Sequence, residues 1–209
     1  MLFSVPPHPT RIRLFQNQFM ELTTLTPFPV FFLIWFGILS WIATVALSHM
    51  GWARLVVALS FGVLLWTLAE YTMHRFLFHM KIKSAYGRRL LFLLHENHHA
   101  DPADPLRGIM PLTVSIPLGA IFWGLAIVAF GPLGHAVFLG FGIGYLMYDT
   151  THWACHQLPM QGGIAKRLKQ HHLRHHYAEQ DANYATTGIF WDRVFRTGMK
   201  RRLERRRAG

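Results

Sequence analysis

The chain has 209 residues, of which 52% are hydrophobic and 15% are charged, whereas about a quarter of the residues in an ordinary soluble domain are charged. This composition argues against a soluble protein and indicates a membrane protein of one domain. The formal net charge of +11 does not indicate a nucleic-acid partner, because the basic residues lie between hydrophobic runs. The single cysteine, Cys155, excludes an intramolecular disulfide and a cysteine-based zinc ribbon.

Four segments are long and apolar enough to cross a bilayer as a helix, which takes about 20 residues. The first two span about 28–50 and 55–73, and a turn of a few residues joins them. The last two span about 109–130 and 134–151, with a short turn rich in glycine and proline between them. We therefore expect an all-α integral membrane fold. Four transmembrane helices would form two hairpins under a cytosolic, helical, histidine-rich cap, as one domain over 1–209.

Glycines recur along the fourth of these segments, at positions 140, 142 and 144. Two of them form a GxxxG pair, a pattern that lets helices approach closely within a membrane. We expect these glycines to serve helix packing rather than chemistry.

The basic residues are distributed unequally across this topology. Two hairpins place the N-terminal lead, 74–108 and 152–209 on one side, which carries 20 of the 21 Lys and Arg residues, Arg54 being the exception. The positive-inside rule makes that side the cytoplasm. We expect the termini and the histidines there, in a bacterial inner membrane rather than the endoplasmic reticulum. The polybasic stretch 200–209 is expected to be a solvated terminus that touches anionic head groups.

Ten of the 14 histidines fall into four groups on this cytoplasmic side. The second and fourth groups have the pattern HxxHH and the third is HxxxH, spacings that put side chains on one helix face. The first two histidines are five residues apart, about 140° around an ideal helix, so they reach one site only if the helix ends or bulges between them. The ten candidate ligands are His74, His79, His95, His98, His99, His152, His156, His172, His175 and His176.

The remaining four histidines, His8, His49, His135 and His171, stand apart. His171 points about 100° away from the line that starts at His172, so we exclude it from the ligands. His49 and His135 fall on the opposite side of the membrane. An isolated HxxxH is more often a surface or hydrogen-bonded pair, but ten imidazoles at one end of an apolar bundle favour bound cations.

Ten imidazoles indicate two metal ions with roughly five ligands each, and imidazole suits iron, copper, nickel and zinc alike. The site lies where acyl chains end and head groups begin, so a lipid substrate is expected. Oxidising an unactivated C–H bond there needs dioxygen and a redox metal, whereas zinc could only polarise a carbonyl or supply hydroxide. Two iron ions therefore fit best, although zinc can occupy the same imidazoles in a purified sample.

A resemblance to a known family is carried by EYTMHRFLFHMK (70–81), HENHH (95–99), YDTTHWACH (148–156), KQHHLRHHYAEQ (169–180) and GIFWDRVFRT (188–197). From about residue 66 to 197, the chain resembles the fatty acid 2-hydroxylase branch of the fatty acid hydroxylase and sterol desaturase superfamily. The resemblance implies a membrane monooxygenase with a diiron centre held by the same ten histidines. It would insert one oxygen atom from O2 at C2 of a long acyl chain, either a free fatty acid or the N-acyl chain of a ceramide or other sphingolipid.

Two departures from that family affect the prediction. Eukaryotic members often carry a fused cytochrome b5 domain, but two spans and a short lead use the 73 residues before the first histidine group here. The resemblance therefore implies no fused cytochrome b5 domain and electrons from a separate protein of the cytochrome b5 or ferredoxin type. Glu96 stands where related members usually have a smaller residue, and we expect its side chain to be solvated.

Two acidic residues near the histidine groups are candidates for orienting ligands. Asp149 precedes His152 by three residues, where its carboxylate could accept a hydrogen bond from the second ring nitrogen. Glu70 precedes His74 by one helical turn, and we predict the same orienting role for its carboxylate. For both residues the alternative is a salt bridge, because a carboxylate at the end of an apolar span needs a partner.

Several residues beside the predicted centre have two interpretations. Tyr148 either faces the substrate or anchors at the interface, where tyrosine is common. Asn183 and Tyr184 are candidates for lining a cap over the metals. Trp191 and Phe195 lie on one face of a late amphipathic helix and are expected to pack rather than to touch substrate.

Three alternative functions remain open. One is another lipid oxidation within the same superfamily, by a sterol or carotenoid hydroxylase or a desaturase. Another is a zinc-dependent membrane lipid hydrolase, which needs about three protein ligands per metal and leaves several histidines unexplained. The third is a haem-binding electron carrier or a metal transporter, which needs polar ligands near the middle of the bilayer, where the expected spans have almost none.

Overall fold

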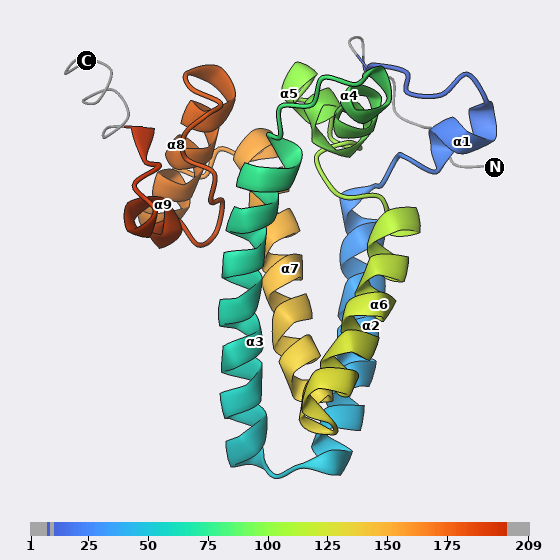
Figure 1. The fold of residues 1–209 in the computed structure, drawn as a ribbon, viewed down its shortest axis with the longest axis vertical. Helices are drawn as coiled ribbons and strands as arrows, with labels where there is room; N and C mark the ends of the chain where they lie inside the picture. The colour runs from blue at the N-terminus through green and yellow to red at the C-terminus, as the bar shows by residue number, and fades with distance from the viewer. Residues whose placement is uncertain (1–7, 9–10, 200–209) are drawn as a thin grey trace.

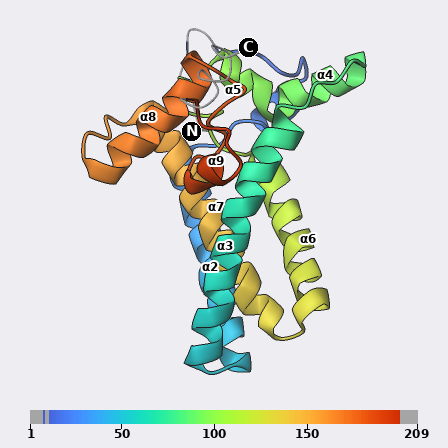
Figure 2. The same cartoon turned by 60° about the vertical axis from the view of Figure 1, so that its left-hand side comes forward.

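The computed structural model describes residue 8 and residues 11–199, and in this part of the chain every regular element is a helix. Four long helices form the bundle: α2 (Phe28–His49), α3 (Trp52–Thr72), α6 (Leu112–Phe130) and α7 (Leu133–Gln157). Shorter elements gather at one end of it, as Figure 1 shows. They are α1 (Gln18–Leu22), η1 (Met73–Phe78), α4 (Ala85–Leu91), η2 (Phe92–Glu96), α5 (Asn97–Ala100), α8 (Gly163–Tyr177) and α9 (Phe190–Val194). The connections α2–α3 and α6–α7 lie at the other end (Figures 1 and 2).

Three helices are long and apolar enough to cross a membrane. They are α2 with 22 residues, α3 continued by η1 with 27, and α6 with 19, and they correspond to three of the four expected spans. The fourth expected span is α7, which is 25 residues long but is not among these three. Because α7 packs against α2, α3 and α6, much of its surface meets protein rather than lipid, and its composition is accordingly less apolar.

Glycines let α3 and α7 approach each other closely. A Cβ atom on Gly62 would lie 2.0 Å from the carbonyl oxygen of Val137, and one on Gly140 would lie 2.0 Å from that of Leu59. The two backbones therefore touch where a side chain would have kept them apart, which is how small residues drive helix contact in membranes. The packing role predicted for Gly140 is confirmed.

Aromatic residues fill the core on the other faces of α7. The ring of Tyr145 makes edge contacts with Phe31 and Trp35 of α2 and with Trp66 of α3. The Trp35 indole also donates a hydrogen bond to Ser115 Oγ of α6 at 3.2 Å. Side chains from all four long helices thus meet around the middle of α7, which fixes its position relative to the histidines at its end.

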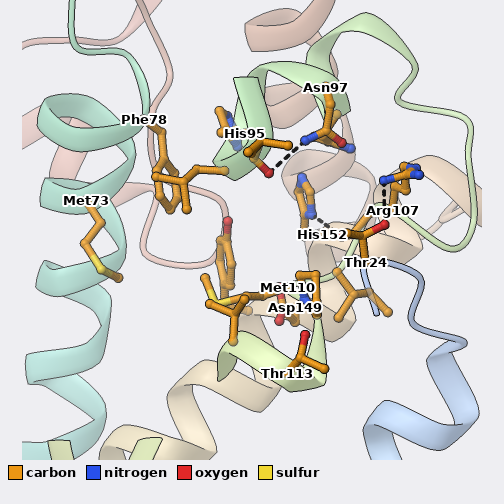
Figure 3. A pocket seen from close by; sticks show the side chains of 18 of the residues that line it. Thr24, Met73, Phe78, His95, Asn97, Arg107, Met110, Thr113, Asp149 and His152 are labelled. Carbon is orange, nitrogen blue, oxygen red and sulfur yellow. Dashed lines mark hydrogen bonds between the residues drawn. The ribbon is translucent and has the colours of Figure 1, made fainter. Parts of the chain in front are cut away.

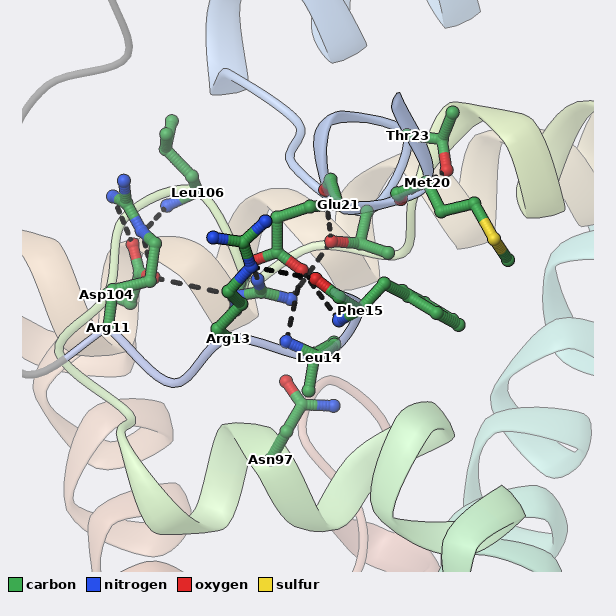
Figure 4. Close-up of polar contacts among 12 residues, drawn as sticks. Arg11, Arg13, Leu14, Phe15, Met20, Glu21, Thr23, Asn97, Asp104 and Leu106 are labelled. Carbon is green, nitrogen blue, oxygen red and sulfur yellow. Dashed lines mark hydrogen bonds and ion pairs between the residues drawn. The ribbon is translucent and has the colours of Figure 1, made fainter. Parts of the chain in front are cut away.

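A buried ion network ties the lead before α2 to the loop before α6 (Figure 4). Asp104 accepts hydrogen bonds from Arg11 Nε at 2.7 Å and Nη2 at 2.9 Å. Glu21 accepts the backbone N–H groups of Leu14 and Phe15, at 3.0 and 2.9 Å, and pairs with Arg107 Nη2 at 2.5 Å. Burial alone would raise the pKa of Asp104, but the hydrogen bond from Arg11 holds that pKa below its ordinary value. The network fixes the lead over one side of the bundle end.

Candidate metal centre

The structure gathers the ten histidines into two sets of five. Within each set, one ring nitrogen from every histidine lies within 4.8 Å of the corresponding nitrogens of the others. The first set is His74, His79, His95, His99 and His175, and the second set is His98, His152, His156, His172 and His176. Ring contacts join the sets, since His99 stacks on His176 with centroids 4.2 Å apart. The centre is therefore one cluster with two foci.

Helical geometry explains how each HxxHH motif serves both sets. In the motif on η2 and α5, His95 and His99 are four residues apart and join the first set, whereas His98 joins the second. On α8, His172 and His176 join the second set, and His175 joins the first. Adjacent residues point about 100° apart, so the neighbouring histidines of each pair face different foci. The motif is suited to bridging two metals.

A π-helix places the first two histidines on one site. Hydrogen bonds in a π-helix such as η1 join residues five positions apart, and the N–H of His79 accordingly donates to the carbonyl oxygen of His74 at 3.2 Å. The Nε2 atoms of the two rings lie 3.2 Å apart. The predicted bulge or helix end between His74 and His79 is confirmed, because the wide turn aligns residues that an α-helix would separate.

Burial keeps the imidazoles of the centre neutral. It lowers the pKa of His95, His98 and His172 well below the ordinary value, and neighbouring imidazoles add to the effect. The pKa of the less enclosed His79 is lowered to about 4 by the same cause. Neutral rings offer a lone pair to a cation, which is the state that a metal ligand needs.

Three histidines have their outer nitrogen fixed by a backbone carbonyl. His74 Nδ1 donates to the carbonyl oxygen of Tyr184, and His175 Nδ1 donates to that of Ala182 at 2.8 Å. His152 Nδ1 donates to the carbonyl oxygen of Gly108 at 2.8 Å. Each bond places the proton on Nδ1 and leaves Nε2 with the lone pair that faces the centre.

The two acidic residues of the sequence prediction make other contacts. The outer nitrogen of His152 bonds to Gly108 rather than to Asp149, which is buried beside the centre. Glu70 accepts the backbone N–H groups of Thr186 and Thr187, at 2.5 and 2.8 Å, and the Thr187 hydroxyl. Sequence spacing could not identify these partners, because the accepting and donating groups belong to backbone far away in the chain.

His171 lies outside both sets, as the helical geometry of α8 predicts. Its Nε2 atom is 2.9 Å from the carboxylate of Asp192, a residue that the sequence analysis did not single out. Asp192 is 1% exposed. Burial by itself raises the pKa of Asp192, but the hydrogen bonds from His171 and Thr197 lower it overall. Only a contact between distant segments could have revealed this residue.

The other candidate residues lie on different sides of the centre. Tyr148 lies parallel to the ring of His152, with centroids 5.8 Å apart. Tyr184 packs beside the first set, with its ring nearly perpendicular to that of His74 and the centroids 5.9 Å apart. Asn183 is buried, and its amide bridges the carbonyl oxygen of His171 and the N–H of Met199. The polybasic stretch 200–209 lies outside the described residues.

Predicted packing of the late aromatic residues is borne out. The Trp191 indole donates to Thr67 Oγ1 of α3 at 3.1 Å, and the ring of Phe195 stacks on Tyr71 with centroids 4.9 Å apart. Both contacts hold the segment around α9 against α3, on the side of the first set.

A pocket of about 300 Å³ opens beside both sets (Figure 3). His95 of the first set and His98 and His152 of the second line it. Most of its wall is apolar and comes from η1, η2, the start of α6 and the loop before it, through residues such as Met73, Phe78, Leu93, Leu94, Ile109 and Val114. An apolar cavity with a few polar groups at one end suits an acyl chain whose polar end reaches the histidines.

The pocket contains one Lys or Arg side chain among the described residues, that of Arg107. Its guanidinium is already engaged, by Glu21 at 2.5 Å and by the Thr24 hydroxyl at 3.0 Å. The one guanidinium of the described wall is therefore already paired with a carboxylate.

The donor set of the centre fits two transition-metal ions. Each set offers five neutral imidazoles, more than the four ligands of a closed zinc site. Calcium and magnesium prefer oxygen ligands, and neither set contains a carboxylate. Five imidazoles around one ion leave room for a further ligand in an octahedral arrangement, so the arrangement suits chemistry at an open position.

Comparisons with known proteins agree with this geometry. The sequence model of a family described as fatty acid hydroxylase matches residues 59–197. A dihydroceramide fatty acyl 2-hydroxylase of Arabidopsis thaliana is 37% identical over 188 residues, covering 88% of this chain and 79% of the relative. A ceramide very long chain fatty acid hydroxylase of Saccharomyces cerevisiae is 36% identical over 186 residues, covering 87% of this chain and 48% of the relative. The solved structure of full-length scs7p, in which only the hydroxylase domain is visible, aligns with a TM-score of 0.81 and 35% identity, over 88% of this chain and 71% of that one.

Proposed function

This chain belongs to the fatty acid hydroxylase family, and we propose that it hydroxylates long acyl chains at C2. The observation that carries the proposal is the apolar pocket that ends on histidines of both sets. The relatives from a plant and a yeast are named as hydroxylases of acyl chains in dihydroceramide and ceramide. A lipid substrate taken from a membrane suits both the pocket and the apolar helices below it.

We propose that the ten histidines hold two iron ions, one in each set. When bound, the metals supply the activation of O2 that breaking an unactivated C–H bond requires. The chain's own part is to hold both sets in one orientation and to enclose the acyl chain in an apolar wall that excludes water. Among the residues beside His152, Asp149 and Tyr148 are proposed to contact the polar end of the substrate.

The ion pair between Arg107 and Glu21 supports a substrate whose acyl chain is in amide linkage rather than a free fatty acid. Apart from the proposed metals, a free carboxylate in this apolar wall could pair only with the guanidinium of Arg107, which already faces Glu21. An amide is neutral and needs only hydrogen bonds, which a hydroxyl group such as that of Tyr148 can supply. We therefore propose the N-acyl chain of a ceramide-type sphingolipid as the preferred substrate.

We further propose that α7 crosses the membrane together with the three apolar helices, which gives four spans in two hairpins within one domain. Its length of 25 residues exceeds the roughly 20 residues that a bilayer requires. Its contacts with α2, α3 and α6 support this placement, because surrounding helices shield its polar side chains from lipid. The basic residues support a cytoplasmic position for the histidine centre.

The expectation of a bacterial inner membrane finds no support, because the relatives named above come from a plant and a yeast. An integral membrane location stands on the apolar helices alone. We propose that electrons arrive from a separate protein of the cytochrome b5 or ferredoxin type.

Labelled oxygen tests the proposal directly. The full chain is incorporated into liposomes that contain a long-chain ceramide, with iron and a chemical or protein reductant, under ¹⁸O₂. The expected product is a ceramide whose acyl chain carries one ¹⁸O atom at C2, identified by mass spectrometry. A product with two fewer hydrogens would indicate a desaturase, and acyl chains released without oxygen would indicate a hydrolase. Either result would overturn the proposed function.

A further inference from the structure

The outer nitrogens of the two histidine sets are not held alike. In the first set, His74 and His175 both donate to carbonyl oxygens of one segment, residues 182–187, which we call the strap. In the second set, only His152 has such an acceptor, the carbonyl oxygen of Gly108. The Nδ1 atoms of three others in the second set are buried and have no hydrogen-bond partner within the described chain: His98, His172 and His176. In the first set, the same is true of His99 alone.

Asp192 holds one half of the strap. Its carboxylate accepts the backbone N–H of Tyr184 at 3.0 Å and that of Ala185 at 2.9 Å. The Thr197 hydroxyl donates to the same carboxylate at 2.7 Å. Tyr184 also provides the carbonyl that fixes His74, so this single residue connects the carboxylate of Asp192 to a histidine of the first set.

Glu70 holds the other half. Its carboxylate accepts both backbone N–H groups of Thr186 and Thr187 and the Thr187 hydroxyl. Glu70 lies on α3, one turn before His74. The continuous helix α3–η1 therefore carries both the ligand His74 and the carboxylate that binds the strap, which orients His74. The side chain is 2% exposed, and water therefore cannot replace these bonds easily.

The strap has no regular structure of its own to keep its shape. It lies between α8 and α9, and its second residue, Asn183, has a φ of 57°, in the left-handed region that asparagine tolerates better than most residues. Its conformation therefore depends on the side chains that receive its N–H groups. Two buried carboxylates accept four of its six N–H groups, and the backbone carbonyls of Glu179 and Thr197 accept those of Ala182 and Asn183.

We propose that Glu70 and Asp192 are positioning residues for the metal of the first set alone. Loss of either frees the strap and with it the carbonyls that orient His74 and His175, whereas Gly108 and the second set keep their geometry. Partners that orient metal-bound histidines typically change metal affinity 10- to 100-fold, so we expect a loss of about that size at one site and none at the other. The inference rests on the proposed function only in that the two sets bind metal.

Metal stoichiometry tests the proposal without any assay of activity. The full chain in detergent is loaded with Zn²⁺, exposed to graded chelator, and analysed for ions per chain by mass spectrometry. Wild type is expected to hold two ions over a range of chelator concentrations in which Glu70→Gln holds about one. Glu96→Gln is the matched control, because it makes the same change at an exposed residue that neighbours the ligand His95 in sequence. It is expected to keep both ions.

Double variants show which set has lost its ion. His95→Ala removes a ligand of the first set, and His156→Ala removes one of the second. Glu70→Gln is expected to remove nothing further from His95→Ala, but to remove the last ion from His156→Ala. Equal loss from both backgrounds, or no loss from either, would overturn the proposal.

Less disruptive changes keep the test decisive if Glu70→Gln does not fold. Thr187→Val removes only the hydroxyl bond to Glu70, and Asp192→Asn keeps an oxygen that accepts one strap N–H. Each is expected to weaken the first set by a smaller factor and to leave the second unchanged. A wild type that binds fewer than two ions would contradict the proposed dimetal function instead, which separates the two failures.

Discussion

Histidines gather at both ends of this bundle, but with different consequences. At the end formed by the α2–α3 and α6–α7 connections, His49 and His135 stack with centroids 5.1 Å apart and rings 4° from parallel. One nitrogen of His135 already accepts the Trp123 indole N–H at 3.1 Å. At the other end, ten rings turn their nitrogens toward two foci, and backbone carbonyls orient three of them. Close histidines alone do not make a metal site, because a metal site typically needs three or more protein ligands that converge on one point.

Among the variants that test the difference between the two ends, His172→Ala should cause the largest loss of metal and of activity. His172 is fully buried in the second set, and its Nε2 lies 2.9 Å from that of His156. Its removal should cost at least one metal ion and reduce hydroxylation by more than about 100-fold, since losing a ligand exceeds the 10- to 100-fold cost of losing a ligand's partner. Metal content and product yield from the same preparation are the measurements.

His171→Ala is the neighbouring control. His171 donates to Asp192 and coordinates nothing in either set, so both ions should remain under loading conditions. We expect a fall in unfolding free energy of about 1–3 kcal/mol, typical of a lost hydrogen bond to a buried charged group. Loss of an ion of the second set in this variant would contradict the assignment of ligands on α8.

Gly140→Ala should disrupt the contact between α3 and α7, two of the helices that join the two ends of the bundle. A Cβ atom there would lie 2.0 Å from the carbonyl oxygen of Leu59, so α3 and α7 must move apart. Overpacking of this kind destabilises proteins by about 1–3 kcal/mol. Gly124→Ala on α6 is the matched control, because nothing lies within 4 Å of its Cβ position. Thermal unfolding in detergent should show a loss for Gly140→Ala that is absent from Gly124→Ala.

Asp104→Asn should weaken the end that carries the histidines in a manner that depends on pH. The pKa of Asp104 is lower in the folded protein than in the unfolded chain, where it is about 3.9. Its charge therefore contributes stability that is fully present above about pH 4 and is lost as the pH falls through the folded pKa. The difference in unfolding free energy between wild type and Asp104→Asn, about 2 kcal/mol at neutral pH, should shrink below pH 4. A difference that grows with acidity would contradict the assigned charge.

His135→Ala should have the smallest effect. It removes the acceptor of the Trp123 indole and one partner of the stacked pair, which together should change the unfolding free energy by about 1 kcal/mol or less. Both ions and the full rate of hydroxylation should remain. A loss of metal from His135→Ala would show that the two ends of the bundle are coupled.

Local spacing was sufficient to predict much of this molecule. Apolar length predicts three helices that the structure places within a few residues of the expected bounds. Spacings of three and four residues predict that the histidines of each group point to one centre, although each HxxHH motif divides its histidines between the two sets. The five-residue spacing of His74 and His79 predicts the irregular turn found at η1. These features depend on neighbours in the chain, which a sequence displays.

Contacts between distant segments were beyond the reach of spacing. The acceptors of His74, His152 and His175 are backbone carbonyls, which every residue possesses and no sequence pattern marks. Asp192 was overlooked for the same reason, since its role appears only when 182–187 folds back toward α3. The division of ligands into sets also required the structure, because it depends on how η2 and α8 face each other.

The wide turn at η1 makes the centre more sensitive to residue count than to residue identity at some positions. Between His74 and His79, the π-helix accommodates one residue more than an α-helical turn would. Deleting one residue between Arg75 and Phe78 would return the segment to α-helical winding, with its histidines four residues apart. The deletion would also rotate all following residues by about 100° around the helix axis and shift them by 1.5 Å along it. Among relatives that share the metal centre, the residues between these two histidines should therefore vary in identity far more readily than in number.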